Sequence, residues 1–141
     1  MTAIWQRAVD LQELNKPGEH INTLLDIRFE EWGDDWISAS MPVDARTHQP
    51  YGILHGGASV VLAESLGSTA SYLCIDPEVS YCVGLDVNAN HLKAVSGGRV
   101  TAVARAVHLG RTTHVWDIRL HNEAGQASCI ARLTMAVVPV K

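Results

Sequence analysis

The segment Gln49–Ser68, QPYGILHGGASVVLAESLGS, decides the fold because an apolar helix begins within it. Residues 58–74 are rich in Ala, Val and Leu, which predicts a helix that is buried on most sides. Small residues recur at Ala63, Gly67 and Ala70, a spacing that lets a curved sheet close tightly around such a helix. The segment therefore predicts one long central helix.

The sequence on both sides of this helix alternates apolar and polar residues, as strands do. Residues 25–29 and 37–41 alternate on either side of the turn EWGDDW, which predicts a hairpin that follows a short helix at 11–15. Further alternating runs predict strands over residues 83–89, 100–109, 113–120 and 127–138. One long helix with several successive strands predicts an α+β fold, an antiparallel β-sheet wrapped around one long central helix.

The predicted strand that begins at residue 83 leads to a histidine that could contact a substrate. His91 is in phase with Val83, Leu85, Val87 and Ala89, so alternation places all five on one face of the sheet. A buried, hydrogen-bonded histidine and a substrate contact are the two interpretations of His91 in this position.

Polar groups gather where the central helix should begin. The N-terminus of a helix offers unpaired N–H groups and partial positive charge, and Gly56 and Gly57 would let a carbonyl oxygen approach them as in an oxyanion hole. His55 would polarise that carbonyl, and Gln49 would position a substrate or a water. The alternative is an ordinary helix-entry turn with a structural histidine.

Glu64 is the only acidic residue in the apolar run. A buried carboxylate costs several kcal/mol, on the order estimated for buried charge, unless it is paired, hydrated or functional. Ser68 follows four residues later on the same helix face, where its hydroxyl would orient the carboxylate or a water, or would simply allow close packing. The combination of Glu64 with the HGG start favours a catalytic site over a structural turn.

Together these motifs resemble those of the hotdog-fold acyl-CoA thioesterases of the phenylacetate-type branch. Besides the opening segment, the chain carries MPVDARTHQP from Met41, VGLDVNANHLKAV from Val83 and HLGRTTHVW from His108, in order and over nearly its whole length. Within the family it is most similar to the thioesterases of menaquinone biosynthesis and of enterobactin proofreading.

The resemblance implies a thioesterase that hydrolyses an aromatic or planar acyl group carried on coenzyme A or on an acyl carrier protein, with no cofactor beyond the coenzyme A of the substrate. It implies Glu64 as general base or nucleophile, and it places His55 and the Gly56 amide at the thioester oxygen. Gln49 and Ser68 would assist catalysis. The substrate-binding residues that it implies are Gly57, Thr69, His91, Lys93 and Arg111.

Thr69 departs from the family, because it is smaller and more polar than the residue expected at this place near the acyl pocket. The resemblance also implies assembly: sheets of two subunits join, each active site takes residues from both, and pairs form a homotetramer, a dimer of dimers. An exposed edge strand is a template for such pairing.

Two other functions fit a hotdog fold. A 3-hydroxyacyl thioester dehydratase also pairs a histidine with a carboxylate, but the HFPG-like motif of the carrier-protein dehydratases is missing here. A non-catalytic acyl-CoA-binding module would use the same pocket, but it would have little need for Glu64 beside helix-end glycines.

Composition predicts a single domain over residues 1–141. A net charge of −4 and a pI near 5.9 argue against nucleic acid as a partner.

Cys74, Cys82 and Cys129 lie in apolar segments without metal-type spacing, so we expect buried free thiols and no metal site. The N-terminal sequence lacks a signal pattern, and Glu64 and several serines interrupt the apolar run, so we expect a cytoplasmic enzyme without a membrane segment.

Overall fold

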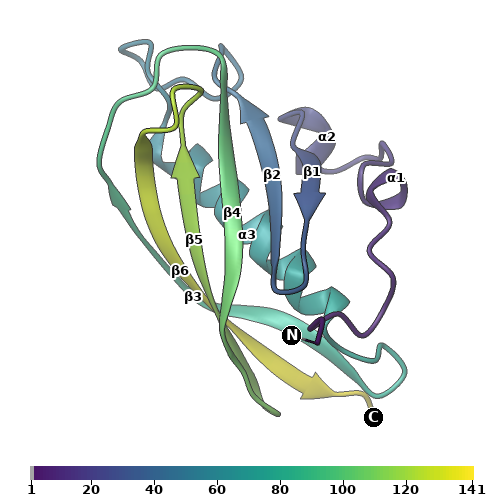
Figure 1. The fold of residues 1–141 in the computed structure, drawn as a ribbon. Helices are drawn as coiled ribbons and strands as arrows, with labels where there is room; N and C mark the ends of the chain where they lie inside the picture. The colour runs from purple at the N-terminus through teal and green to yellow at the C-terminus, as the bar shows by residue number, and fades with distance from the viewer. Residues whose placement is uncertain (1) are drawn as a thin grey trace.

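The computed structural model describes residues 2–141, in which one antiparallel sheet curves around one long helix (Figure 1). The strand order is β1-β2-β4-β5-β6-β3, so β3 and β1 are the two edges. The elements in chain order are α1 (Leu11–Leu14), α2 (Ile21–Leu24), β1 (Arg28–Trp32), β2 (Trp36–Pro42), α3 (Gly56–Leu73), β3 (Ser80–His91), β4 (Arg99–Leu109), β5 (Thr113–His121) and β6 (Ala127–Pro139). The predicted α+β architecture is confirmed.

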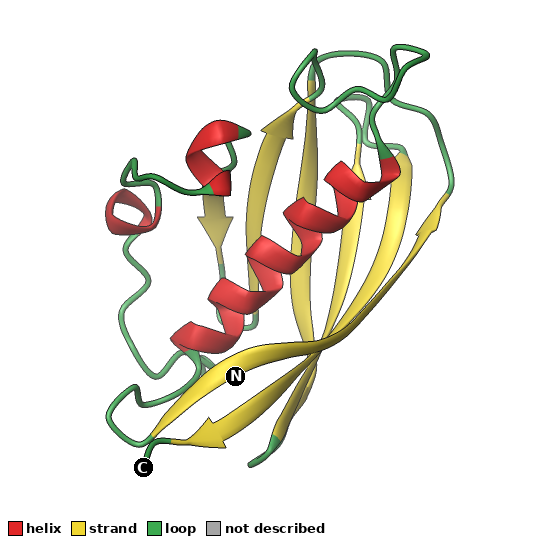
Figure 2. Cartoon of the chain, turned by 180° about the vertical axis from the view of Figure 1, so that it is seen from behind, coloured by secondary structure: helices red, strands yellow, loops and turns green. Residues whose placement is uncertain are grey.

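Helix α3 lies across the inner face of the sheet (Figure 2), and small residues line the contact. Ala63 and Ala70 are fully buried. At Gly67 a Cβ atom would lie 2.5 Å from Leu133 Cδ2 on β6 and 2.9 Å from Ile118 Cδ1 on β5, closer than real Cβ contacts allow. The predicted role of these small residues in close helix–sheet packing is therefore confirmed.

The C-terminal half of α3 is tied to the sheet by a buried polar network. Trp116 Nε1 donates to Ser71 Oγ at 2.7 Å, and Ser71 Oγ lies 2.9 Å from His114 Nδ1. If Ser71 donates its proton to Nδ1, the Ser71 hydroxyl both accepts from Trp116 and donates to His114. Trp5 stacks on Trp116 with 6.4 Å between ring centroids, which fastens the N-terminal segment to the core.

This network makes stability depend on pH. Burial lowers the pKa of His114 below its ordinary value, and the charge of His108 adds to the shift. The unfolded chain, with a histidine pKa of about 6.5, therefore takes up the proton first as the pH falls. We expect the His114 contribution to the free energy of unfolding to be complete above about pH 6.5 and to decline below it, by at most about 1.4 kcal/mol per pH unit.

Thermal unfolding midpoints measured from about pH 7.5 to about pH 5.5 would test this. His114→Gln should flatten the acid-side slope, whereas His20→Gln, at an exposed site, should leave it unchanged. An equal slope in the wild type and in His114→Gln would contradict the expectation.

The register of β3 differs from the predicted alternation. Pairing with β6 shifts between Gly84 and Asp86, so Leu85 is the extra residue of a β-bulge. Gly84 faces α3, its neighbour Val83 faces away and is 45% exposed, and His91 lies back on the inner face. The prediction that Val83 and Leu85 share a face with His91 is wrong, because one inserted residue moves all later side chains to the other face.

Further differences are small. Helix α1 ends at Leu14, one residue earlier than predicted, and α2 was not predicted. A single turn without a side-chain cap is too short to give a periodic signal. The first strand, predicted over residues 25–29, is β1 at Arg28–Trp32, because α2 ends just before it and its C-cap is Leu25.

Within residues 2–141, no helix combines the length and the apolar content needed to cross a bilayer.

Candidate active site

The start of α3 is held by His55. His55 is the N-cap residue, and its Nδ1 accepts a hydrogen bond of 2.8 Å from the Gly57 N–H. Because Nδ1 accepts, the proton of the neutral ring is on Nε2, which is left as a donor. The His55 N–H donates to Thr47 O at 2.8 Å, and Thr47 Oγ1 donates to Pro42 O at 2.8 Å, which fixes the loop. The structural interpretation of His55 therefore holds, and the same bond orients its free nitrogen for chemistry.

A cavity of about 390 Å³ lies beside this helix start. The loop before α3, the first turn of α3 and the C-terminal end of β3 form its walls. Of the predicted site residues, it brings together Gln49, Gly56, His91 and Lys93.

The cavity is also lined by two serines that no sequence pattern indicates. Ser59 on α3 and Ser128 on β6 are both buried and both line it. Ser128 Oγ has no hydrogen-bond partner within residues 2–141. A serine in an apolar element gives no signal of its own in the sequence, so only the fold identifies this pair.

Gly56 is in close contact with His91. A Cβ atom on Gly56 would lie 2.8 Å from His91 Nε2, so the histidine ring fills the space that a side chain would need. The Gly56 N–H donates to no acceptor within residues 2–141. The arrangement thus provides a free backbone donor at the positive end of α3, beside an imidazole.

Glu64 lies outside this cavity, more than two turns further along α3. The separation from Gly56 along the helix axis is about 12 Å at the usual rise per residue. The Glu64 side chain is half-buried, and its Oε2 atom lies against Gly84 of β3. The expectation of a buried carboxylate is wrong for the single chain, because Glu64 packs against β3, which is an edge strand of the sheet.

Ser68 and Thr69 follow Glu64 by about one turn, and both hydroxyls already have partners. Ser68 Oγ donates to Met135 Sδ at 3.7 Å, and Thr69 Oγ1 donates to Ser65 O at 2.9 Å. Ser68 is thus on the predicted helix face, but in the single chain its proton is directed to a thioether and not to the Glu64 carboxylate.

Arg111 is separated from the other predicted substrate contacts. It lies in the turn between β4 and β5, at the lower end of the sheet in Figure 1. The neighbouring Thr113 pairs with Ala136 of β6, whereas His91 pairs with Cys129 near the other end of that strand. Within one chain, the structure does not bring Arg111 to Lys93 and His91.

The cysteines are free, as expected, but only Cys129 is fully buried. Burial raises the pKa of the Cys74 thiol to about 12, and nearby Cys82 adds to the shift, so Cys74 is a weak nucleophile at neutral pH. Within residues 2–141, no group of three or more His, Cys, Asp or Glu side chains is placed to hold a metal ion.

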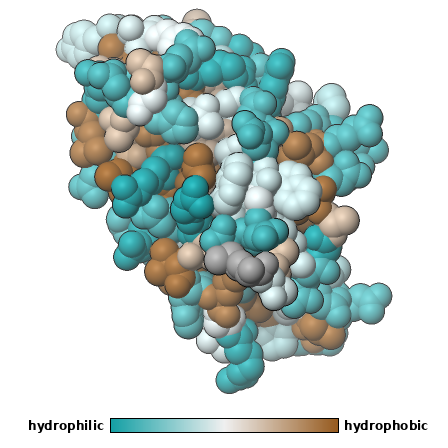
Figure 3. All heavy atoms as spheres, viewed as in Figure 1, coloured by the Kyte–Doolittle hydropathy of each residue, from teal (hydrophilic) through white to brown (hydrophobic). Residues whose placement is uncertain are grey.

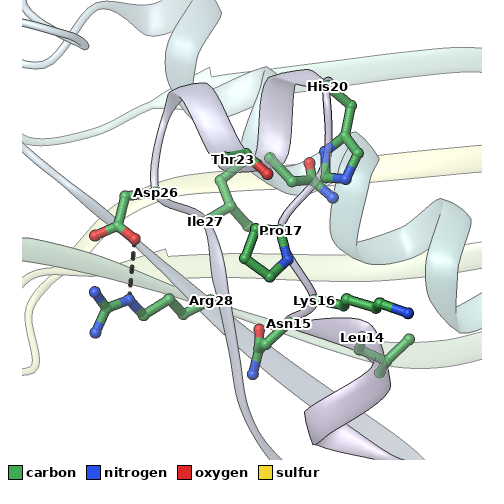
Figure 4. Close-up of a pocket in the computed structure, with 10 residues that line it drawn as sticks. Leu14, Asn15, Lys16, Pro17, His20, Thr23, Asp26, Ile27 and Arg28 are labelled. Carbon is green, nitrogen blue, oxygen red and sulfur yellow. Dashed lines mark hydrogen bonds and ion pairs between the residues drawn. The ribbon is translucent and has the colours of Figure 1, made fainter.

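A second hollow of about 290 Å³ lies between α1, α2 and β1 (Figure 4). Its carboxylate, Asp26, is already paired with Arg28 at 3.0 Å and with Arg99 at 3.1 Å. The hollow shares no lining residue with the cavity at the start of α3. None of the predicted site residues lies there.

Comparisons with known proteins identify the family of this chain. The Thioesterase superfamily model matches residues 51–129. The 1,4-dihydroxy-2-naphthoyl-CoA hydrolase of Escherichia coli is 52% identical over 136 residues, which cover 96% of this chain and 99% of the relative. The proofreading thioesterase EntH of Cronobacter turicensis is 44% identical over 138 residues, 96% of this chain and 98% of the relative.

The fold is shared as closely as the sequence. The crystal structure of a mutant thioesterase from Pseudomonas aeruginosa superposes with a TM-score of 0.96 at 65% identity, covering 98% of this chain and all of that one. The resemblance found in the sequence is thereby confirmed. The chain belongs to the thioesterase superfamily, and its sheet wrapped around one helix is the hotdog fold of that family.

Proposed function

We propose that this thioesterase hydrolyses an aromatic or planar acyl thioester of coenzyme A or of an acyl carrier protein, at a site built by two chains. The observation that supports the proposal is the separation along α3. The free Gly56 N–H opens into one cavity, while the Glu64 carboxylate lies about 12 Å further on and faces the edge strand. One thioester carbon cannot contact both groups of the same chain.

A second copy of the chain supplies the missing half. β3 is a 12-residue edge strand whose outer side is unpaired within residues 2–141, and such an edge is a template for another strand. Antiparallel pairing of two such edges would set the α3 helices side by side. Each Glu64, which already faces this edge, would then lie beside Gly56 of the other chain, as in an isologous dimer.

Such dimers would form a dimer of dimers through a further surface. On the face of the sheet turned away from α3, apolar side chains are mixed with polar ones (Figure 3). Tyr81 and Val83 are 48% and 45% exposed, and both belong to β3. Contact between two dimers through this face would cover them.

The proposed reaction uses two polar centres. The Gly56 N–H and His55 Nε2–H would hold the negative charge that develops on the thioester oxygen. Glu64 would take a proton from a water that attacks the carbonyl carbon, after which the C–S bond breaks and the thiolate leaves. Alternatively, the carboxylate would attack directly, expel the thiolate and form an anhydride that water then cleaves. Gln49 would position the water or the acyl group.

The acyl preference rests on the named relatives. One acts on a naphthoyl thioester by its name, and another is a proofreading thioesterase. Thr69 and Ser68 would place small, polar groups beside the acyl group, which suits an aromatic ring that carries hydroxyl groups. A naphthoyl substrate would place the chain in menaquinone biosynthesis. Lys93 and His91 would border the pantetheine arm, and Arg111 of the second chain would approach the nucleotide.

Product analysis on a panel of aromatic and aliphatic acyl-CoAs and acyl carrier proteins tests this proposal. We expect release of free thiol, with kcat/KM for aromatic acyl groups at least about 10-fold above that for aliphatic ones, the scale of a well-fitted apolar contact. Loss of water to give an enoyl product would identify a dehydratase. Binding without turnover would identify an acyl-CoA-binding module.

A further inference from the structure

Gly84 has no room for a side chain because the Glu64 carboxylate occupies the space. A Cβ atom at position 84 would lie 2.6 Å from Glu64 Oε2 and 3.7 Å from Glu64 Cδ. Its next neighbour, Met135 Sδ, would be at 3.9 Å, an ordinary van der Waals distance. The tight contact at this position is therefore with the carboxylate alone.

Backbone conformation does not explain this glycine. The glycines with positive φ angles are Gly52, Gly98 and Gly125, and Gly84 is not among them. A glycine inside a strand weakens that strand, because it loses more conformational freedom on folding and packs no side chain. Gly84 lies inside β3 and therefore destabilises the strand. The feature to be explained is the space that the missing side chain leaves beside Glu64.

The β-bulge at Leu85 determines which face of β3 Gly84 occupies. It follows Gly84 immediately and lets the strand change phase between Gly84 and Asp86. Gly84 therefore faces α3, whereas the acidic side chain of Asp86 is exposed. A bulge next to an active site commonly re-aims nearby side chains in this way.

We propose that Gly84 is a positioning residue that fixes where the Glu64 carboxylate lies. The proposal rests on the catalytic role of Glu64 given above. Any side chain at position 84 would push Oε2 away from β3, and a glutamate can yield by rotating its flexible side chain. The fold would therefore tolerate the change, while the carboxylate would leave its reactive position.

The test is Gly84→Ala in the full chain, with Gly97→Ala as a matched control because a Cβ at Gly97 meets nothing within 4 Å. We expect the Gly84→Ala kcat to fall by about 10- to 100-fold, the scale of a misplacement by about 1 Å, with KM nearly unchanged. The thermal midpoint should not decrease. Gly97→Ala should match the wild type in every measurement.

A double-mutant cycle separates positioning from packing. In a Glu64→Ala background, Gly84→Ala should cause no further loss of rate and no loss of stability. With the shorter Glu64→Asp, whose carboxylate is withdrawn from β3, Gly84→Ala should reduce the rate less than it does with Glu64. A loss of stability that persists without the carboxylate would mean that the Cβ clashes elsewhere, and this would overturn the proposal.

A crystal structure of Gly84→Ala decides the positional claim independently of activity. A carboxylate rotated away from an unmoved β3 supports it, and an unmoved carboxylate with a displaced strand overturns it. If Glu64→Ala kept full turnover, the proposed catalytic role of Glu64 would fail, yet this structure would still show whether Gly84 sets the position of the carboxylate.

Discussion

Replacement of Glu64 by alanine is expected to lower kcat by about 100- to 10,000-fold, the usual contribution of a general base. The carboxylate forms no ion pair within residues 2–141 and lies half-buried against a glycine. It thus contributes little to the fold, and the variant should keep its secondary structure, its assembly and its thermal midpoint. Free thiol release from the best thioester of the panel measures the effect.

Glu78→Ala is the matched control for this variant, since Glu78 is an exposed glutamate in the loop before β3. It should retain wild-type kcat. If Glu64→Ala retained wild-type kcat as well, Glu64 would not be the catalytic carboxylate, and the two-chain site would lose its central group.

Mixing two inactive variants should regenerate activity. His55→Ala removes a proposed donor to the thioester oxygen and should lower kcat by about 100-fold or more, with a smaller effect on KM. In a mixed dimer, the chain with intact His55 and Gly56 meets the intact Glu64 of its partner. At equal mixing half of the dimers are mixed, and each has one complete site, so activity should recover to about a quarter of the wild-type value.

The mixture should be unfolded and refolded together so that the chains exchange, and thiol release should be compared with that of each variant alone. Mixing His55→Ala with Gln49→Ala is the control. Gln49 lines the cavity at the start of α3 and His55 is the N-cap of the same helix, so both groups belong to the same half of the site and no complete site can form. A fully active monomer in sedimentation, or mixed dimers without activity, would exclude the shared site.

The sequence by itself determined the scaffold and the chemical type of the site. Residues 58–74 and the alternating runs around them specify a helix and strands by local periodicity, and Ala63, Gly67 and Ala70 mark the face that meets the sheet. HGG marks a helix start, because glycine and a capping side chain act within a few residues of one another. Local patterns were enough here, since each depends on neighbours in the chain.

The tertiary structure alone decided how the site is assembled. The contact of His91 with Gly56, the serines in the cavity and the space that Gly84 leaves for Glu64 all join residues far apart in the chain. The bulge at Leu85 reverses the face of every earlier residue of β3, although the apolar alternation there looks regular. Such features follow from how the helix and the strands pack against one another, and local periodicity contains no information about packing distance or strand register.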